Sequence, residues 1–264
     1  MSVNALMACY ANPMRVVDAA DFDGTNDYML KTTEFTGLSD SKKGIISIWI
    51  RKDGGDATAM RIFSNANGAS SSTRCEVTHN GSSFGTDNTF AIKLRNSSAY
   101  DDTANILYME TLNTYTAGAS WIHILASWDL ATSAYYLYIN GTSDINTGND
   151  LIVDDTIDYT LGRWAVGASG NGSFKLDSCL AELYFAPGQY LDISIASNRR
   201  KFISASGKPV HLGTDGSLPT GTAPIVYLHL DDGDAVANFA TNRGTGGDFT
   251  ITGTLDTAST SPSD

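Results

Sequence analysis

The sequence predicts an all-β fold in which two antiparallel sheets pack as a β-sandwich of the jelly-roll type, with one short helix. Two observations carry this prediction. Residues 121–128 alternate in a period-two pattern that is typical of a strand and too apolar for a solvated one. Short alternating segments of this kind recur at intervals of about ten residues between turns rich in Gly and Asn, as they do in packed antiparallel sheets.

The first half of the chain supplies most of the expected strands. Residues 1–18 show no clear period, and their apolar side chains favour an N-terminal arm that covers another surface. The sandwich itself is expected over residues 19–206. Its first strand, residues 22–30, is interrupted by a turn at Asp23-Gly-Thr-Asn26. Further strands are expected at residues 45–51, 61–64, 75–79, 90–95 and 106–112.

Residues 121–144 are expected to form the hairpin around which the fold is organised. The second arm, residues 134–140, alternates again and ends at Asn140-Gly141, a dipeptide that tolerates positive φ and favours a tight reversal. One face of this arm carries Tyr135, Leu137 and Ile139, and the other carries Tyr136 and Tyr138. The first arm is predicted to be a central strand because both of its faces are apolar.

Residues 191–203 are predicted to be the short helix. Asp192 is a plausible N-cap, apolar residues follow at helical spacing, and Gly207 lies beyond the end. We expect this helix to lie on the sandwich.

Residues 207–264 are predicted to be a C-terminal extension that packs on the sandwich. A long connector punctuated by Pro and Gly leads to strands expected at residues 225–230 and 248–253. The Ser- and Thr-rich tail, residues 254–264, gives no basis for order.

Composition excludes several classes of partner. The chain has 264 residues, 42% of them hydrophobic, and a formal net charge of −12. It is long enough to bury a sizeable core, and its negative field repels phosphate backbones and anionic lipid surfaces. We therefore expect neither nucleic-acid nor membrane binding. The N-terminus shows neither a secretory signal nor a membrane span, and the three cysteines are too few for a disulfide framework. We expect buried thiols and folding in a reducing cytoplasm.

Four groups of residues carry a family resemblance. Trp121-Ile-His123, Ala126-Ser-Trp-Asp129 and Leu137-Tyr-Ile-Asn140-Gly141 resemble the "W-x-H … D … L-Y-x-N-G" core of laminin-G-like domains in the concanavalin A-like superfamily. Three further segments agree in order: Phe22-Asp-Gly-Thr-Asn-Asp27-Tyr28, Ile46-Ser-Ile-Trp49-Ile, and Tyr159-Thr-Leu-Gly162 through Leu183-Tyr-Phe185. The resemblance covers about residues 20–190 and implies a lectin-like β-sandwich.

The C-terminal extension carries a second, shorter resemblance. Residues 213–224 and 242–253 are similar to the ending of laminin-G-like structural proteins of tailed phages and prophages. This implies a non-enzymatic structural or adhesion component of a virion made in the host cytoplasm: a capsid decoration, or a tail or fibre part. Its expected partners are other virion proteins or further copies of itself in a homo-oligomer, with a cell-surface glycan as a candidate. The alternatives are a carbohydrate-binding, lectin-like module and a divergent glycoside hydrolase.

The hydrolase alternative requires two facing carboxyl groups. Retaining glycosidases hold them about 5 to 5.5 Å apart across the scissile bond. The E-x-D-x-x-E run of the enzymes in the superfamily is absent here, and the nearest substitute, Asp177 with Glu182, has an odd separation that places the two acids on opposite faces of a regular strand. We therefore expect no catalytic residues and no enzymatic activity.

One loop is a candidate for Ca²⁺. Asp144, Asn146 and Asp150 form an oxygen-rich segment, and Ca²⁺ prefers such ligands in a flexible turn. The pattern departs from an EF-hand because Asn149 stands where Gly is needed and Asp155 replaces the closing Glu. Ca²⁺ is thus the one candidate cofactor, and the scattered histidines indicate no transition-metal site.

Glycan binding requires an exposed aromatic platform with polar groups nearby. The candidates are Tyr136 and Tyr138, which share one face of their strand, and Trp164. The alternative is that these rings fill the core between the sheets or a subunit contact.

Overall fold

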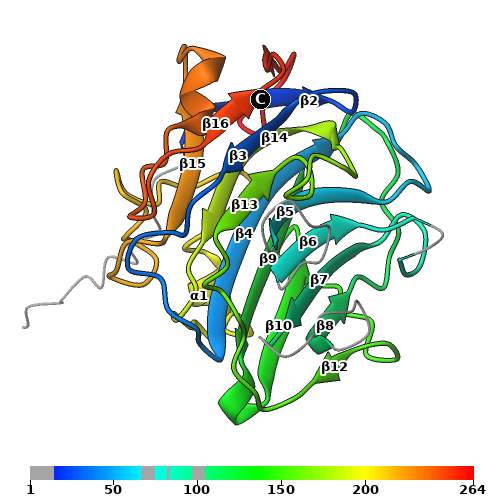
Figure 1. The fold of residues 1–264 in the computed structure, drawn as a ribbon, viewed down its shortest axis with the longest axis vertical. Helices are drawn as coiled ribbons and strands as arrows, with labels where there is room; N and C mark the ends of the chain where they lie inside the picture. Colours follow the sequence, from blue (N-terminus) through cyan, green and yellow to red (C-terminus); the bar gives the residue numbers. More distant parts are fainter. Residues whose placement is uncertain (1–14, 67–74, 82–83, 97–104) are drawn as a thin grey trace, which may run out of the picture.

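The computed structural model describes residues 15–66, 75–81, 84–96 and 105–264, and forms two antiparallel sheets packed face to face (Figure 1). The first sheet has nine strands and the second has eight. The predicted all-β sandwich with one short helix is confirmed. The expected N-terminal arm and Cys9 lie largely outside the described residues.

The first sheet carries the candidate site. Its main path runs in the order β1 (Val17–Asp18), β15 (Val226–Asp231), β14 (Asp177–Phe185), β4 (Lys43–Lys52), β9 (Ile122–Asp129), β10 (Ala134–Ile139) and β11 (Thr142–Ser143). Two further strands extend it, β2 (Ala20–Asp23) along β14 and β17 (Asp256–Thr257) along β2.

The second sheet forms the opposite layer. Its order is β12 (Leu151–Ile152), β8 (Asn105–Glu110), β7 (Phe90–Arg95), β6 (Cys75–His79), β5 (Met60–Ala66), β13 (Arg163–Val166), β3 (Tyr28–Lys31) and β16 (Thr250–Thr252). Figure 1 shows β16, near the C-terminus, beside β3, near the N-terminus. The segment 207–264 therefore contributes strands to both sheets as well as packing on them.

The predicted turn at Asp23 separates the sheets. The Asp23 carboxylate accepts hydrogen bonds from the backbone N–H groups of Thr25 (2.8 Å) and Asn26 (3.0 Å), while Gly24 takes φ +70°. Strand β2 before the turn belongs to the first sheet, and β3 after it belongs to the second. One interrupted segment thus begins both layers.

The predicted hairpin is confirmed, and β9 lies between β4 and β10 in the interior of the first sheet. Asn140 and Gly141 both take positive φ, 51° and 79°, as the turn requires. Leu137 and Ile139 enter the core between the sheets, whereas Tyr136 and Tyr138 lie on the outer face of the first sheet. The alternation read from the sequence therefore assigns both faces correctly.

The core between the sheets is aromatic and close-packed. Trp128 from β9 is fully buried, and its indole N–H donates to the Tyr159 hydroxyl over 3.0 Å. A Cβ atom on Gly44 of the neighbouring strand would lie 2.3 Å from the Trp128 ring, so only glycine fits there.

The helix is shorter than the sequence predicts. The α-helix α1 spans only Ala196–Arg199, and Ile195 rather than Asp192 is its N-cap. Asp192 instead closes a turn by accepting from the backbone N–H of Ser194 over 2.9 Å. Two 3-10 helices, η1 (Leu130–Thr132) and η2 (Val236–Ala240), complete the helical elements that the structure describes, and all are far shorter than a membrane crossing requires.

Two segments cover the outer face of the first sheet. Residues 186–212 pack apolar side chains, including those of Ile193 and Phe202, against Ile45, Leu125 and Tyr184. The C-terminal tail, defined here as residues 256–264, covers a second area around Trp49. The Ser- and Thr-rich composition offered no basis for order in this tail. Its order comes from pairing and side-chain contacts that no local pattern encodes.

Candidate binding site

The C-terminal tail is fastened to the sheet at several points. Strand β17 pairs with β2, and the backbone N–H of Ala258 donates to the Ala19 carbonyl over 2.9 Å. The Thr260 hydroxyl accepts from the Arg51 guanidinium (2.5 Å) and from the Trp121 indole (3.2 Å). The tail therefore forms a fixed wall above β4 and the start of β9.

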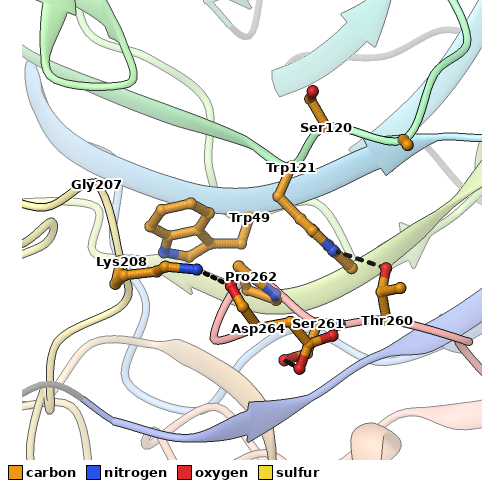
Figure 2. A pocket seen from close by; sticks show the side chains of 10 residues that line it. Trp49, Ser120, Trp121, Gly207, Lys208, Thr260, Ser261, Pro262 and Asp264 are labelled. Carbon is orange, nitrogen blue, oxygen red and sulfur yellow. Dashed lines mark hydrogen bonds between the residues drawn. The ribbon is translucent and has the colours of Figure 1, made fainter.

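A cavity of about 340 Å³ lies between this wall and the sheet (Figure 2). Its volume falls within the range of about 300 to 1,000 Å³ that is usual for small-molecule sites. We call it the central cavity. Its lining residues are Trp49, Ala119, Ser120, Trp121, Gly207, Lys208, Thr260, Ser261, Pro262 and Asp264.

Two tryptophans line the central cavity, and Trp121 is the more exposed of the two. Trp49 projects outward from β4 and is only 1% exposed, with its ring 4.6 Å from the His123 ring. Trp121 is half-buried, and the Arg51 guanidinium lies 5.8 Å from the centre of its ring. Figure 2 shows both indoles beside the tail residues, with Lys208 bonded to the Asp264 main-chain carbonyl. The cavity thus combines aromatic surface with hydroxyl, amine and carbonyl groups.

The Trp49 indole N–H is buried and has no hydrogen-bond partner among the described residues. Leaving such a donor unpaired costs about 1–3 kcal/mol. In the neighbouring His123, Nε2 is hydrogen-bonded to the Ser47 hydroxyl over 2.8 Å. The other ring nitrogen, Nδ1, has no hydrogen-bond partner among the described residues. Buried polar atoms of this kind mark positions where water or a ligand is expected to bind.

Burial lowers the pKa of His123 to about 3. An unfolded histidine titrates near 6.5, so the folded state binds fewer protons and loses stability as the pH falls below about 6.5. We expect His123→Gln to remove about 2 kcal/mol of the stability difference between pH 7 and pH 5, measured by urea unfolding. Leu112→Gln, at an exposed position without a titratable group, is the control and should leave the difference as in the wild type. An unchanged difference in His123→Gln would show that the ring is hydrated.

Two further cavities flank the central one. The first, about 370 Å³, is lined by Arg51, Lys52, Asp53, Gly118, Ala119, Ser259 and Thr260. The second, about 420 Å³, is lined by Arg15, Val16, Ser206, Lys208 and Ser263. The first shares Ala119 and Thr260 with the central cavity, and the second shares Lys208.

The charged groups at both ends are paired. Arg51 donates to both carboxylate oxygens of Asp53, at 2.9 and 3.1 Å, and this hydrogen bonding raises its pKa. Arg15 is ion-paired with Asp231, and Lys52 lies 2.9 Å from Asp56. The flanking cavities therefore present groups that donate and accept hydrogen bonds while carrying little uncompensated charge.

Asp21, Asp53 and Cys179 bring three potential metal ligands within 4.8 Å of one another, and no other such group occurs in the described part of the chain. The arrangement fits a cation poorly. The Arg51 guanidinium donates to both Asp53 and Cys179, and the Cys179 thiol donates to Asp53 over 2.9 Å. Burial raises the pKa of Cys179, which opposes the thiolate that a metal needs.

The glycan candidates read from the sequence lie elsewhere. Trp164 is fully buried in the core between the sheets, where it stacks on Phe63 at 5.0 Å. Tyr136 and Tyr138 are half-buried under the segment that contains α1, and the Arg199 guanidinium lies 4.5 Å from the Tyr138 ring. Only Trp164 lies where the core alternative places it, because Tyr136 and Tyr138 are on the outer face of the first sheet. The structure does not bring the three rings together.

The calcium candidates are also engaged by protein groups. Asp144 is 5% exposed and accepts from the Asn113 side chain (2.6 Å) and the Tyr115 hydroxyl (2.5 Å). Asp150 accepts from Tyr135, and Asn146 accepts from the backbone N–H of Gly148. Each of the three residues is thus hydrogen-bonded to other protein groups. Ca²⁺ binding at this loop stays a prediction.

The carboxyl groups of Asp177 and Glu182 have separate surroundings. A β-bulge between Leu180 and Glu182 interrupts the regular alternation of β14, so the parity argument from the sequence does not apply to this strand. Burial raises the pKa of Glu182 to about 7, and its hydrogen-bond partner is Tyr227. The charges acting on Asp177 are those of Asp53, Lys52 and Asp23.

Sequence reasoning assigned Trp49 and Trp121 to strands but not to a site. The signal was present for Trp49, because the alternation of β4 places it on the same face as Ser47 and Arg51, opposite the isoleucines of the core. A face that mixes an indole with a serine and an arginine indicates an outer surface. The contribution of the tail could not be read in this way.

Comparison with known proteins supports the fold. No family model matches the chain, and no curated protein sequence matches it either. Among solved structures, a Bacteroides ovatus protein provisionally described as a carbohydrate binding protein matches with a TM-score of 0.60 at 13% identity, over 93% of this chain and 60% of that one. The similarity is one of fold, a two-sheet β-sandwich of the jelly-roll type.

Two weaker matches have TM-scores below 0.5. The native heptameric SAP-like pentraxin of Limulus polyphemus gives 0.48 at 15% identity, over 70% of this chain and 82% of that one. The receptor binding domain of botulinum neurotoxin type G gives 0.43 at 14% identity, over 75% of this chain and 48% of that one. Only the Bacteroides ovatus match is similar enough to support the fold argument.

Proposed function

We propose that this protein is a non-enzymatic binding module whose ligand is a carbohydrate held in the central cavity. The observation that carries the proposal is the half-buried Trp121 indole, which lines one cavity together with hydroxyl groups and with the buried Trp49 ring, whose indole N–H has no partner among the described residues. Sugars present apolar C–H faces, which stack on aromatic rings, and hydroxyls, which need donors and acceptors. The description of the Bacteroides ovatus protein agrees with this choice, although a shared fold alone does not determine function.

The proposal makes a prediction for Trp121. On a glycan array followed by calorimetric titration of the glycan that binds most tightly, we expect Trp121→Ala to weaken affinity at least tenfold. A tenfold change corresponds to about 1.4 kcal/mol, which is the size of a lost ring contact. Leu112→Ala is a control because Leu112 is 66% exposed and lines none of the three cavities. An unchanged affinity in Trp121→Ala would place the site elsewhere, and an array without any binding would contradict the proposal.

The absence of enzymatic activity is part of the same proposal. A hydrolase needs two carboxyl groups facing each other across a groove, and the residues that line the central cavity include one carboxylate side chain, that of Asp264. Incubation with common polysaccharides should release no reducing sugar. Measurable release of reducing sugar would contradict the binding-module proposal and indicate a divergent glycoside hydrolase.

A second candidate function places the module in a phage or prophage particle. It rests on the similarity of residues 213–224 and 242–253 to the ending of phage structural proteins. On this view the protein contacts other virion proteins or further copies of itself, and the carbohydrate is on the host surface. Mass spectrometry of particles from an induced lysogen should detect the protein, and light scattering should detect a homo-oligomer. Particles that lack the protein, together with a strictly monomeric state, would contradict this placement.

A further inference from the structure

Three cavities border the C-terminal tail. Neighbouring cavities share lining residues, with Thr260 common to the first pair and Lys208 common to the second. Each cavity also takes part of its wall from the tail: Ser259 at one end, Pro262 in the middle and Ser263 at the other end. The cavities are therefore segments of one groove between the tail and the rest of the sandwich.

The spacing along β4 gives the scale of the groove. Arg51 lines the first cavity and Trp49 lines the central one, and the two residues are separated by one position on the same strand. Side chains on one face of a strand repeat at about 7 Å for every two residues. The third cavity, at Val16 and Ser263, adds a further segment beyond Lys208. Three neighbouring cavities that share lining residues suit a chain of linked units better than one compact molecule.

The chemistry changes along the groove. The central cavity is aromatic, whereas the ends carry ion pairs, Arg51 with Asp53 and Arg15 with Asp231. An ion pair supplies donors and acceptors together, which matches a hydroxyl group that does both. The net charge of −12 disfavours a polyanion in this groove.

We propose that the groove binds a neutral oligosaccharide chain of at least three sugar units, with one unit against Trp121 in the central cavity and its neighbours in the two flanking cavities. This inference rests on the proposed carbohydrate-binding function and specifies its ligand class. It predicts an affinity that depends on chain length and falls when either end of the groove is filled.

The test is a calorimetric titration series with cello-, malto-, xylo- and chito-oligosaccharides of one to six units, and with oligogalacturonates of the same lengths. For the series that binds, we expect Kd to fall at least tenfold between one and three units and then to level off. Val16→Trp, at a side chain that is 60% exposed, should fill the third cavity and make the levelling occur at a shorter chain. Leu112→Trp is the matched control on an exposed surface outside the groove.

The outcomes separate the two proposals. A Kd that does not change between one and six units, or that Val16→Trp leaves unaltered at every length, would overturn the groove while leaving a single-sugar site. Tighter binding of oligogalacturonates than of every neutral series would overturn the neutral ligand class. Failure of the protein to bind any of these sugars, or any glycan on the array, would overturn the carbohydrate-binding function itself.

Discussion

Replacing Glu76 with glutamine is expected to lower the free energy of unfolding by about 3–5 kcal/mol, the usual cost of removing one partner from a buried ion pair. Glu76 is 1% exposed on β6, with Arg61 at 2.6 Å and Arg95 at 3.1 Å. Burial alone would raise its pKa, but the charges of Arg61, Arg95 and Lys93 outweigh burial and hold the pKa below its ordinary value.

The neighbouring cations cannot readily move to solvent. The Arg61 guanidinium packs against the rings of both Phe84 and Phe174, 4.9 and 4.7 Å from their centres. Glutamine keeps the size of the side chain and removes only its charge. The loss of unfolding free energy therefore measures electrostatics rather than packing. Urea unfolding of Glu76→Gln checks the prediction, with Glu34→Gln, at an exposed position, as the control. A loss below 1 kcal/mol would show that water reaches the cluster.

Replacing Trp164 with alanine is expected to cost about 3–5 kcal/mol of stability, as large-to-small changes of buried aromatic residues do. The ring is fully buried, and it contacts Phe35 and Phe63, each at 5.0 Å, and Phe185 at 5.4 Å. The contacting rings come from both layers of the sandwich, so the cavity that alanine leaves would lie in the middle of the core.

This variant also separates the core from the binding site. Below its lowered melting temperature, Trp164→Ala should bind glycan like the wild type, whereas Trp121→Ala should lose binding at a smaller cost in stability than Trp164→Ala, because its ring is only half-buried. Thermal unfolding and calorimetric titration of both variants test the contrast. If a fully folded Trp164→Ala protein did not bind glycan, Trp164 would belong to the binding site, as predicted from the sequence.

Local patterns predicted the layers of this fold but not its binding surface. Alternation in β10 assigned Tyr136 and Leu137 to the correct faces because an antiparallel strand fixes the direction of each side chain. The same pattern gave no means to decide whether a ring on the outer face is covered. The cover over Tyr138, the segment containing α1, is held by packing against distant strands, which no local signal records.

The helix and the tail show the same limit. Residues 191–203 have a helical period, yet only four of them form a helix. The segment begins with a turn at Asp192 and packs Ile193 and Phe202 against the sheet through irregular backbone. The tail has the composition of a linker, yet Thr260 is held by Arg51 and Trp121. Such contacts depend on residues far apart in the chain, so the central cavity could not be predicted from sequence.

The pairing of strands from opposite ends of the chain determines when this protein can complete its fold. Asp256 pairs with Asp21, and Val17 pairs with Asp231, so the first sheet joins residues from opposite ends of the chain. Contacts of such high sequence separation make folding slow, since long loops must close before they form. On the ribosome, the groove would remain without one wall until residues 256–264 emerge. A nascent chain halted before them would expose the indoles of Trp49 and Trp121 and be a target for chaperones.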